Sequence, residues 1–188
     1  MNNTLVVFKF ERAEISDIII IYSSRYTDAR GFFEEGYKLS AFLKEGIEKS
    51  FTQLNHSFSK KGVLRGLHYQ KSPYSQGKLV FVFRGKIIDV AVDIRPSSPS
   101  FKKWVSVTLS DKMPASLWIP PGFAHGFLAM EDTDIIYFTS AEYNADYESG
   151  IRWNDPDVNV TWPVESPILS EKDSNLPFIR ELILWGEL

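Results

Sequence analysis

The chain has 188 residues and a formal net charge of −3 at pH 7, with 21 basic residues scattered among 24 acidic ones. This length suits a single domain spanning residues 1–188, and the charge provides no basic face for nucleic acid. There are no cysteines, which excludes disulfides, thiolate metal sites and a cysteine nucleophile and makes a cytoplasmic location the default expectation.

The N-terminal part contains one short apolar run, Ile18–Ile21. It is far too short to cross a bilayer and lacks the basic flank and cleavage site of a signal peptide, so we expect no membrane partner. Further along, Leu39, Phe42 and Leu43 have helical spacing between Tyr37 and Ile47. This spacing predicts a short peripheral helix.

The middle of the chain has the pattern of short strands separated by turns. The apolar run Leu79–Phe83 is followed by the tight connection Arg84–Lys86, which predicts a hairpin. In the next strand Asp89, Ala91 and Asp93 alternate with Ile and Val residues, as expected when one sheet face is buried more deeply than the other. Further strands are predicted at 105–109, 117–119, 126–130 and 135–139. Regular short strands at this spacing indicate an all-β antiparallel sandwich or barrel.

The C-terminal part has less regular structure. Residues 153–167 contain three prolines, but Trp153 and Trp162 give this stretch apolar surface to pack, so we expect an ordered loop. Apolar residues at positions 178, 179, 182 and 183 then repeat a helical spacing and predict a second peripheral helix.

Groups that can move protons gather in three runs, at residues 65–70, 76–80 and 119–127, ahead of Tyr137. They include His68 and Lys78. In a regular strand Arg65 and His68 would face opposite sides, but Gly66 permits a bulge or a twist, which makes their convergence possible. An imidazole, an ammonium and a phenol in one cavity are suited to general acid–base chemistry.

Other kinds of chemistry find less support. Pro121–His125 is similar only to the last part of the metal motif of cupin barrels, and the usual His-x-His pair is missing because Tyr69 and Gln70 follow His68. A metal-dependent cupin remains an alternative, with His56 as a third imidazole. The chain has no Gly-x-Ser-x-Gly elbow, Walker A loop or dinucleotide fingerprint. We therefore predict neither a metal nor a cofactor.

These motifs closely resemble the dTDP-4-dehydrorhamnose 3,5-epimerase family of cofactor-free cupins. The resemblance extends in order over residues 27–180, through the runs 65–70, 77–80, 89–95, 118–127, 150–156 and 169–173. It implies an all-β cupin-type jelly roll with a few short peripheral helices, and a homodimer with exchange of N-terminal strands. It also implies the substrate dTDP-4-dehydro-6-deoxy-D-glucose, inverted at C3 and C5.

The resemblance also implies a role for each site residue. His68 matches the proton acceptor, Asp173 its orienting carboxylate, Tyr137 the proton donor on the opposite sugar face, and Lys78 a group that stabilises the enolate at C4. The implied substrate-binding residues are His125 near the C4 oxygen, Arg65, Gln53 and Asn55 at the pyrophosphate and sugar, Tyr143 stacked on thymine, Glu148 and Lys172 as further contacts, and Arg30 and Glu35 from across the dimer.

The chain departs from the family pattern at three positions. Leu54 stands where many relatives have Asp, Phe138 replaces a frequent Lys, and Glu142 occupies the place of a second Tyr. Relatives that invert a single carbon keep nearly the same residues. A single-carbon epimerase of a related 4-keto sugar nucleotide therefore stays an alternative, as does a non-catalytic cupin that binds sugar nucleotides.

Overall fold

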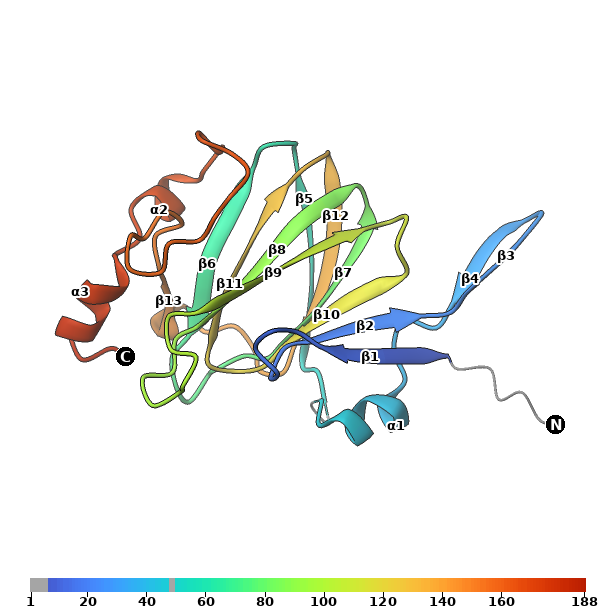
Figure 1. Cartoon of the computed structure of the whole chain (residues 1–188), viewed down its shortest axis with the longest axis horizontal. Helices are drawn as coiled ribbons and strands as arrows, with labels where there is room; N and C mark the ends of the chain where they lie inside the picture. The colour runs from blue at the N-terminus through green and yellow to red at the C-terminus, as the bar shows by residue number, and fades with distance from the viewer. Residues whose placement is uncertain (1–6, 48–49) are drawn as a thin grey trace.

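The computed structural model describes residues 7–47 and 50–188. Two antiparallel sheets face each other (Figure 1), which confirms the predicted all-β jelly-roll architecture. The six-stranded sheet has the order β1 (Phe8–Arg12), β2 (Ile19–Ser23), β10 (Ala115–Ile119), β7 (Lys78–Arg84), β12 (Thr133–Thr139), β5 (Gln53–Ser59). The five-stranded sheet has the order β13 (Glu148–Gly150), β6 (Leu64–Gln70), β11 (Phe123–Ala129), β8 (Lys86–Asp93), β9 (Trp104–Ser110).

Apolar side chains from alternate positions of both sheets meet between them. Val80, Leu117 and Ile135 of the six-stranded sheet belong to one buried cluster with Ile87 and Phe127 of the five-stranded sheet. The period of two in the sequence therefore sets which side chains enter the core. This packing fills one part of the interior and leaves polar residues to line the rest.

Strand β8 differs from the expectation of one well-buried and one less-buried face. Asp89 and Asp93 are fully buried, whereas Ile88 on the other face is only half-buried. The aspartate face points into the space between the sheets, and the apolar face is covered by the C-terminal segment, including Val158 and Trp162. The alternation is correct, but it does not show which face is the interior.

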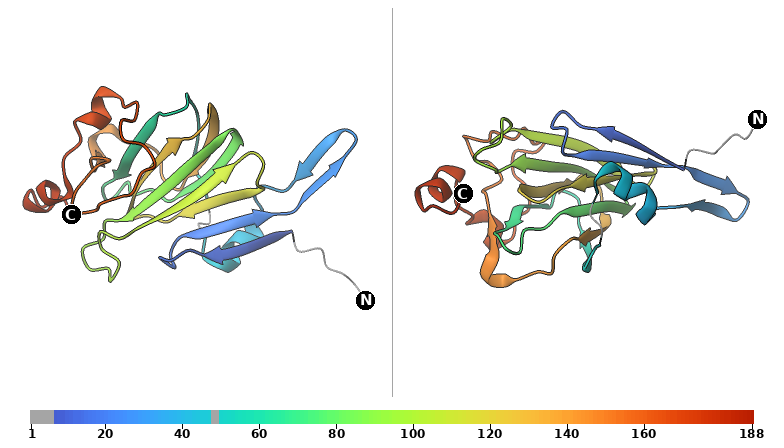
Figure 2. Two further views of the ribbon diagram at one scale, coloured as in Figure 1. Left: turned by 45° about the horizontal axis from the view of Figure 1, so that its top comes forward. Right: turned by 90° about the horizontal axis from the view of Figure 1, so that it is seen from below.

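Short helices cover the outer faces of the sheets. The first predicted helix is confirmed as α1 (Leu39–Phe42), followed by the 3-10 turn Leu43–Glu45, and Phe42 packs on the six-stranded sheet. At the other side of the molecule lie α2 (Glu171–Ser174) and the second predicted helix, α3 (Ile179–Leu184) (Figures 1 and 2). Among the described residues, no helix has the length and apolar character needed to cross a membrane.

A two-stranded ribbon, β3 (Arg25–Asp28) and β4 (Gly31–Glu34), projects away from both sheets (Figures 1 and 2). Phe32 and Phe33 on this ribbon are 60% and 66% exposed. A two-stranded hairpin with apolar side chains facing water has little stability of its own. The ribbon therefore leaves apolar surface uncovered within one chain.

Candidate active site

Two adjoining cavities, of about 270 and 290 Å³, share His68, Lys78 and Tyr137 in their walls. All the predicted site residues except Arg30 and Glu35 line one or the other cavity. Gln53, Asn55, Tyr143 and Glu148 line the first, and Arg65, His125, Lys172 and Asp173 line the second.

Gly66 brings Arg65 and His68 to the same cavity. The pairing of β6 with β11 matches His68 with His125 but Arg65 with Phe127, so β6 has one extra residue between the two pairs. Gly66 lies in this bulge with φ of 116°, a conformation that favours glycine. Of the two distortions that Gly66 permits, the structure has the bulge.

His68 forms a short hydrogen bond with the carboxylate of Asp173. The His68 Nε2–H donates to Asp173 Oδ1 over 2.6 Å, which leaves Nδ1 free to accept a proton. Burial opposes ionisation of Asp173, but the hydrogen bonds from His68 and Ser170 outweigh it and hold the Asp173 pKa below its usual value. The pair thus has the arrangement of a base with an orienting carboxylate.

Asp173 reaches His68 because α2 is capped at its start. The Ser170 side chain accepts a hydrogen bond from the Asp173 backbone N–H over 3.0 Å. Lys172 of the same helix forms an ion pair with Glu148, with 2.5 Å between Nζ and Oε1. One short helix therefore contributes two predicted site residues.

Lys78 begins β7 and is only 8% exposed. Its Nζ donates to the carbonyl oxygen of His68 over 3.3 Å. Burial lowers the Lys78 pKa to about 8, although the nearby carboxylates of Asp89 and Glu148 oppose this shift. At neutral pH Lys78 is thus a protonated donor in a cavity of low dielectric.

A second histidine–aspartate pair faces the first. His125 Nε2–H donates to Asp89 Oδ1 over 2.5 Å, and His125 lies directly opposite His68 in the pairing of β11 with β6. Burial lowers the His125 pKa, against the opposing effect of Asp89. His125 is therefore a neutral imidazole at pH 7.

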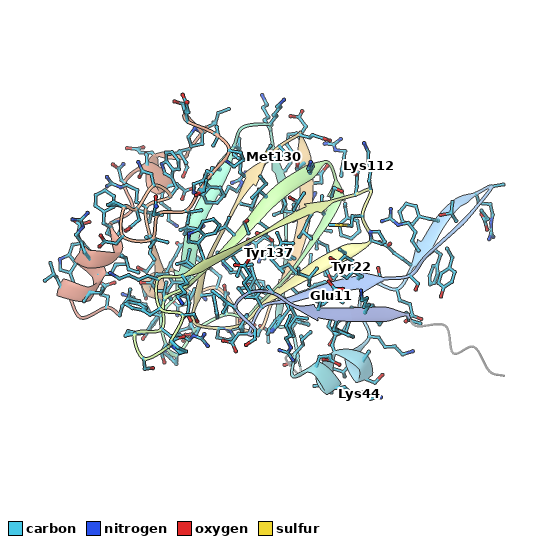
Figure 3. All side chains as sticks on the ribbon, in the orientation of Figure 1. Glu11, Tyr22, Lys44, Lys112, Met130 and Tyr137 are labelled. Carbon is cyan, nitrogen blue, oxygen red and sulfur yellow. The ribbon has the colours of Figure 1, made fainter. Side chains whose placement is uncertain are left out.

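Tyr137 lies on the inner face of β12, towards the middle of the molecule (Figure 3). Its register partner on β5 is Asn55, another cavity residue. Burial raises the Tyr137 pKa, an effect that the positive charge of Arg65 partly opposes. The phenol is therefore protonated at neutral pH and can act as an acid.

Glu148 connects two of the remaining cavity residues. The Tyr143 hydroxyl donates to Glu148 Oε2 over 2.7 Å, and Lys172 pairs with the other carboxylate oxygen. Burial of Glu148 opposes ionisation, but these two partners outweigh it and lower its pKa. Tyr143 itself is 51% exposed and lines the first cavity, so its side chain is accessible to a ligand.

A family model described as dTDP-4-dehydrorhamnose 3,5-epimerase matches residues 12–181 of the chain. The chain belongs to this family. The dTDP-4-dehydrorhamnose 3,5-epimerase of Shigella flexneri is 49% identical over 166 residues, which cover 87% of this chain and 92% of that protein.

Solved structures of epimerases are also similar. A 3,5-epimerase from Legionella pneumophila, in complex with dTDP-4-keto-L-rhamnose, has a TM-score of 0.88 and 41% identity, and the match covers 92% of this chain and 93% of that one. A 3'-monoepimerase from Streptomyces bikiniensis, in complex with dTDP-quinovose, has a TM-score of 0.89 and 29% identity, with coverage of 95% and 91%.

Two residues assigned from the epimerase family lie apart from the cavities. Arg30 sits at the tip of the β3–β4 ribbon, where it pairs with Asp28. Glu35 follows the ribbon, and its buried Oε2 accepts no hydrogen bond from the described residues. Within one chain, neither residue joins the other epimerase site residues.

The departures from the epimerase family pattern do not alter the cavities. Leu54 and Phe138 are register partners on β5 and β12, one position away from the cavity residues on the same strands, and so face outward. Glu142 contacts the cavity residue Gln70 through its backbone, since its carbonyl oxygen accepts a hydrogen bond from the Gln70 side-chain amide. His56 also faces outward and pairs with Asp134.

Asp89 is a site residue that the sequence analysis missed. Its Oδ1 holds His125, and its buried Oδ2 accepts no hydrogen bond from the described residues. An aspartate in an alternating strand is usually exposed, so Asp89 was not recognised as a partner of His125. The available signal was that Asp89 and Asp93 share a strand face.

Other polar groups in the described parts of the chain form no competing centre. Within them, no three His, Cys, Asp or Glu side chains are placed to hold a metal ion. A larger hollow of about 510 Å³ lies beside Arg95, but this guanidinium already pairs with Asp93 and Asp17. The candidate reacting groups therefore lie around His68 and His125.

Proposed function

We propose that this chain is an isomerase that inverts C3 and C5 of dTDP-4-dehydro-6-deoxy-D-glucose to give dTDP-4-dehydro-L-rhamnose, for dTDP-L-rhamnose biosynthesis. The observation that carries the proposal is the His68–Asp173 pair, which shares one cavity with Lys78 and Tyr137. The 49% identity to the Shigella flexneri epimerase supports the same reaction.

The first step is removal of a proton from a carbon next to the C4 ketone. His68 Nδ1 accepts this proton, and the electron pair of the C–H bond forms an enolate with its charge on the C4 oxygen. Lys78 donates a hydrogen bond to that oxygen as the charge develops, and His125 lies next to Lys78 in the cavity wall. The burial of Lys78 strengthens this interaction.

The second step is protonation from the opposite sugar face. The Tyr137 hydroxyl gives its proton to the same carbon and the ketone re-forms, so the carbon is inverted. His68 then loses its proton to solvent and Tyr137 regains one. Because C3 and C5 both flank the ketone, the same groups can carry out both inversions.

Asp173 assists without touching the substrate. It fixes the His68 tautomer and stabilises the imidazolium that forms when the proton is taken up. The low pKa of Asp173 means that it keeps its negative charge throughout.

The diphosphate of the substrate needs cations on an acidic protein. Arg65 donates to Ser59 Oγ and to the Phe58 carbonyl oxygen, over 2.9 and 3.0 Å, and is exposed at the cavity. These neutral acceptors are weaker partners than a phosphate. Arg65 therefore turns to the diphosphate, while Gln53 and Asn55 contact the sugar and nucleotide.

The proposal includes a homodimer. The outer face of the six-stranded sheet carries exposed Leu54 and Phe58 on the edge strand β5 and exposed Phe83 on β7, and the β3–β4 ribbon offers exposed Phe32 and Phe33. Apolar surface of this extent favours burial against a second copy. The ribbon of one subunit would carry Arg30 and Glu35 to the site of the other.

Inversion of a single carbon is the second candidate, because the Streptomyces bikiniensis 3'-monoepimerase has nearly the same fold. Its 29% identity is lower than the 41% of the Legionella pneumophila 3,5-epimerase, which favours double inversion.

A cytoplasmic location stays a prediction.

The test is to incubate the protein with dTDP-4-dehydro-6-deoxy-D-glucose and follow the sugar by NMR. We expect conversion to the L-lyxo product. Tight binding without any conversion would instead identify a non-catalytic sugar-nucleotide-binding protein.

A further inference from the structure

All three glutamines of the chain direct their side-chain amides to one short segment, residues 141–144, between β12 and β13. Gln53 begins β5, Gln70 ends β6 and Gln76 precedes β7. Three separate parts of the fold therefore converge on one stretch of backbone in the wall of the first cavity.

The contacts follow the backbone of this segment in order. Gln76 Nε2 donates to the Ala141 carbonyl oxygen over 2.8 Å, and Gln70 Nε2 donates to that of Glu142 over 3.1 Å. Gln53 Oε1 then accepts from the Tyr143 N–H over 2.8 Å, and Gln70 Oε1 accepts from the next N–H, that of residue 144, over 2.7 Å. An amide can both donate to carbonyls and accept from N–H groups, which suits this task.

Gln70 is the most constrained of the three. It is only 6% exposed, and its second N–H donates to the Tyr74 carbonyl oxygen over 3.0 Å. Both donors and the acceptor of this amide are thus used to join two loops. By contrast, the Tyr143 side chain makes one hydrogen bond within the described part of the chain, to Glu148, so the position of its ring depends on the Tyr143 backbone.

We propose that Gln70 is a positioning residue for nucleotide binding, because it fixes the backbone that carries Tyr143 before the ligand arrives. Ordering this segment during binding would reduce affinity, and Gln70 removes that cost. The inference rests on the proposed function and on the stacking of the Tyr143 ring on thymine that the family resemblance implies. It assigns no chemical step to Gln70.

The test is Gln70→Met, which keeps the shape of the side chain and removes its hydrogen bonds. We expect KM for the sugar nucleotide and Kd for dTDP to rise about tenfold, as for the loss of one or two hydrogen bonds. The value of kcat should change less than about threefold, since the reacting groups stay in place. Amide hydrogen exchange at residues 143 and 144 should become faster.

The matched control is Thr133→Val at the other end of β12. Thr133 is fully buried, and its hydroxyl bonds to the carbonyl oxygens of Lys86 and Glu131. This substitution also removes buried hydrogen bonds, but far along the strand from the segment. It should lower Tm without changing KM or Kd.

A second variant, Gln70→Glu, keeps the acceptor for residue 144 but sets an anion against two carbonyl oxygens. Its KM should exceed that of wild type most at high pH, and the excess should shrink at low pH, where protonation restores a donor. Unchanged KM and Kd in both variants, or a fall in kcat alone, would overturn the inference. Failure of wild type to bind dTDP would instead contradict the proposed function.

Discussion

His68 is the residue on which the proposed chemistry depends most, because it alone is assigned the removal of both protons. Replacing His68 with Asn should lower kcat by about a thousandfold or more at C3 and C5 together, as expected for loss of a general base. The measurement is the rate of solvent exchange at each carbon, followed by NMR.

The control for this substitution is His56→Asn. His56 lies on the outer face of the six-stranded sheet, paired with Asp134. Its replacement should leave both exchange rates close to those of wild type. Exchange that persists at one carbon in His68→Asn would show that a second base serves that carbon.

Lys78 leads to a prediction about pH. Its pKa of about 8 lies below its usual value, so Lys78 is protonated below about pH 8 and loses its proton above it. Because the proton stabilises the enolate oxygen, kcat/KM should fall as the pH rises through about 8. Steady-state kinetics from pH 6 to 10 measure this limb of the profile.

Lys78→Arg is the matched variant, because a guanidinium stays charged over this range. It should be slower than wild type at pH 7 and should lack the fall near pH 8. The same fall in Lys78→Arg would assign it to another group.

At the scale of elements, the bulge in β6 determines whether Arg65 and His68 share a cavity. A Cβ atom on residue 66 would lie 2.6 Å from Gly126 Cα and 2.7 Å from the His125 carbonyl oxygen. Gly66→Ala should therefore destabilise the fold by about 3 kcal/mol or more and also lower kcat, because His68 and His125 are displaced. Thermal unfolding and turnover are measured on the same sample.

Gly46→Ala separates the two effects. Gly46 also has a positive φ, of 78°, but a Cβ there lies within 4 Å of no atom in residues 7–47 and 50–188. It should cost about 1 kcal/mol in stability and leave turnover unchanged. Equal activities for the two variants would contradict the role assigned to the bulge.

Elements with a regular apolar pattern were predictable, and those without one were not. Strands β7 and β12 follow from apolar runs and alternation, and Gly66 indicated where a bulge was possible. Helix α2 contains no apolar residue, so it has no periodic apolar signal. The buried face of β8 depends on the opposite sheet, so Asp89 could not be recognised from its own strand.

At the scale of the whole molecule, the proposed dimer makes each site depend on two chains. Arg30→Ala should raise KM more than tenfold, because a charged contact with the diphosphate is lost. Mixing this variant with His68→Asn should restore activity at low substrate. In a mixed dimer, the site that keeps His68 receives an intact Arg30 from its partner.

Random exchange of subunits would restore about a quarter of the wild-type sites. The measurement is turnover at low substrate after refolding the two variants together. Activity equal to the sum of the separate variants would contradict a site shared between subunits. Gel filtration of Phe83→Lys, which places a charge on the exposed sheet face, tests the interface independently.

The site residues differ in how far they could be assigned from the sequence. His68, Lys78 and Tyr137 were predicted from the sequence runs themselves, but Asp173 and the binding residues outside those runs, such as Tyr143, came from the family resemblance, since they lie far from His68 in the sequence. In the proposed dimer, Arg30 and Glu35 would reach the site from the second subunit, so their place would be set by assembly and not by local sequence.

The most direct test of double inversion is the incubation of wild-type protein with dTDP-4-dehydro-6-deoxy-D-glucose in deuterated water. Mass spectrometry and NMR then locate the deuterium in the sugar. The mechanism predicts deuterium at both C3 and C5, because each carbon is reprotonated by Tyr137 after exchange with solvent. Deuterium at one carbon would indicate a single-carbon epimerase, and none at either carbon would contradict the proposed enzyme.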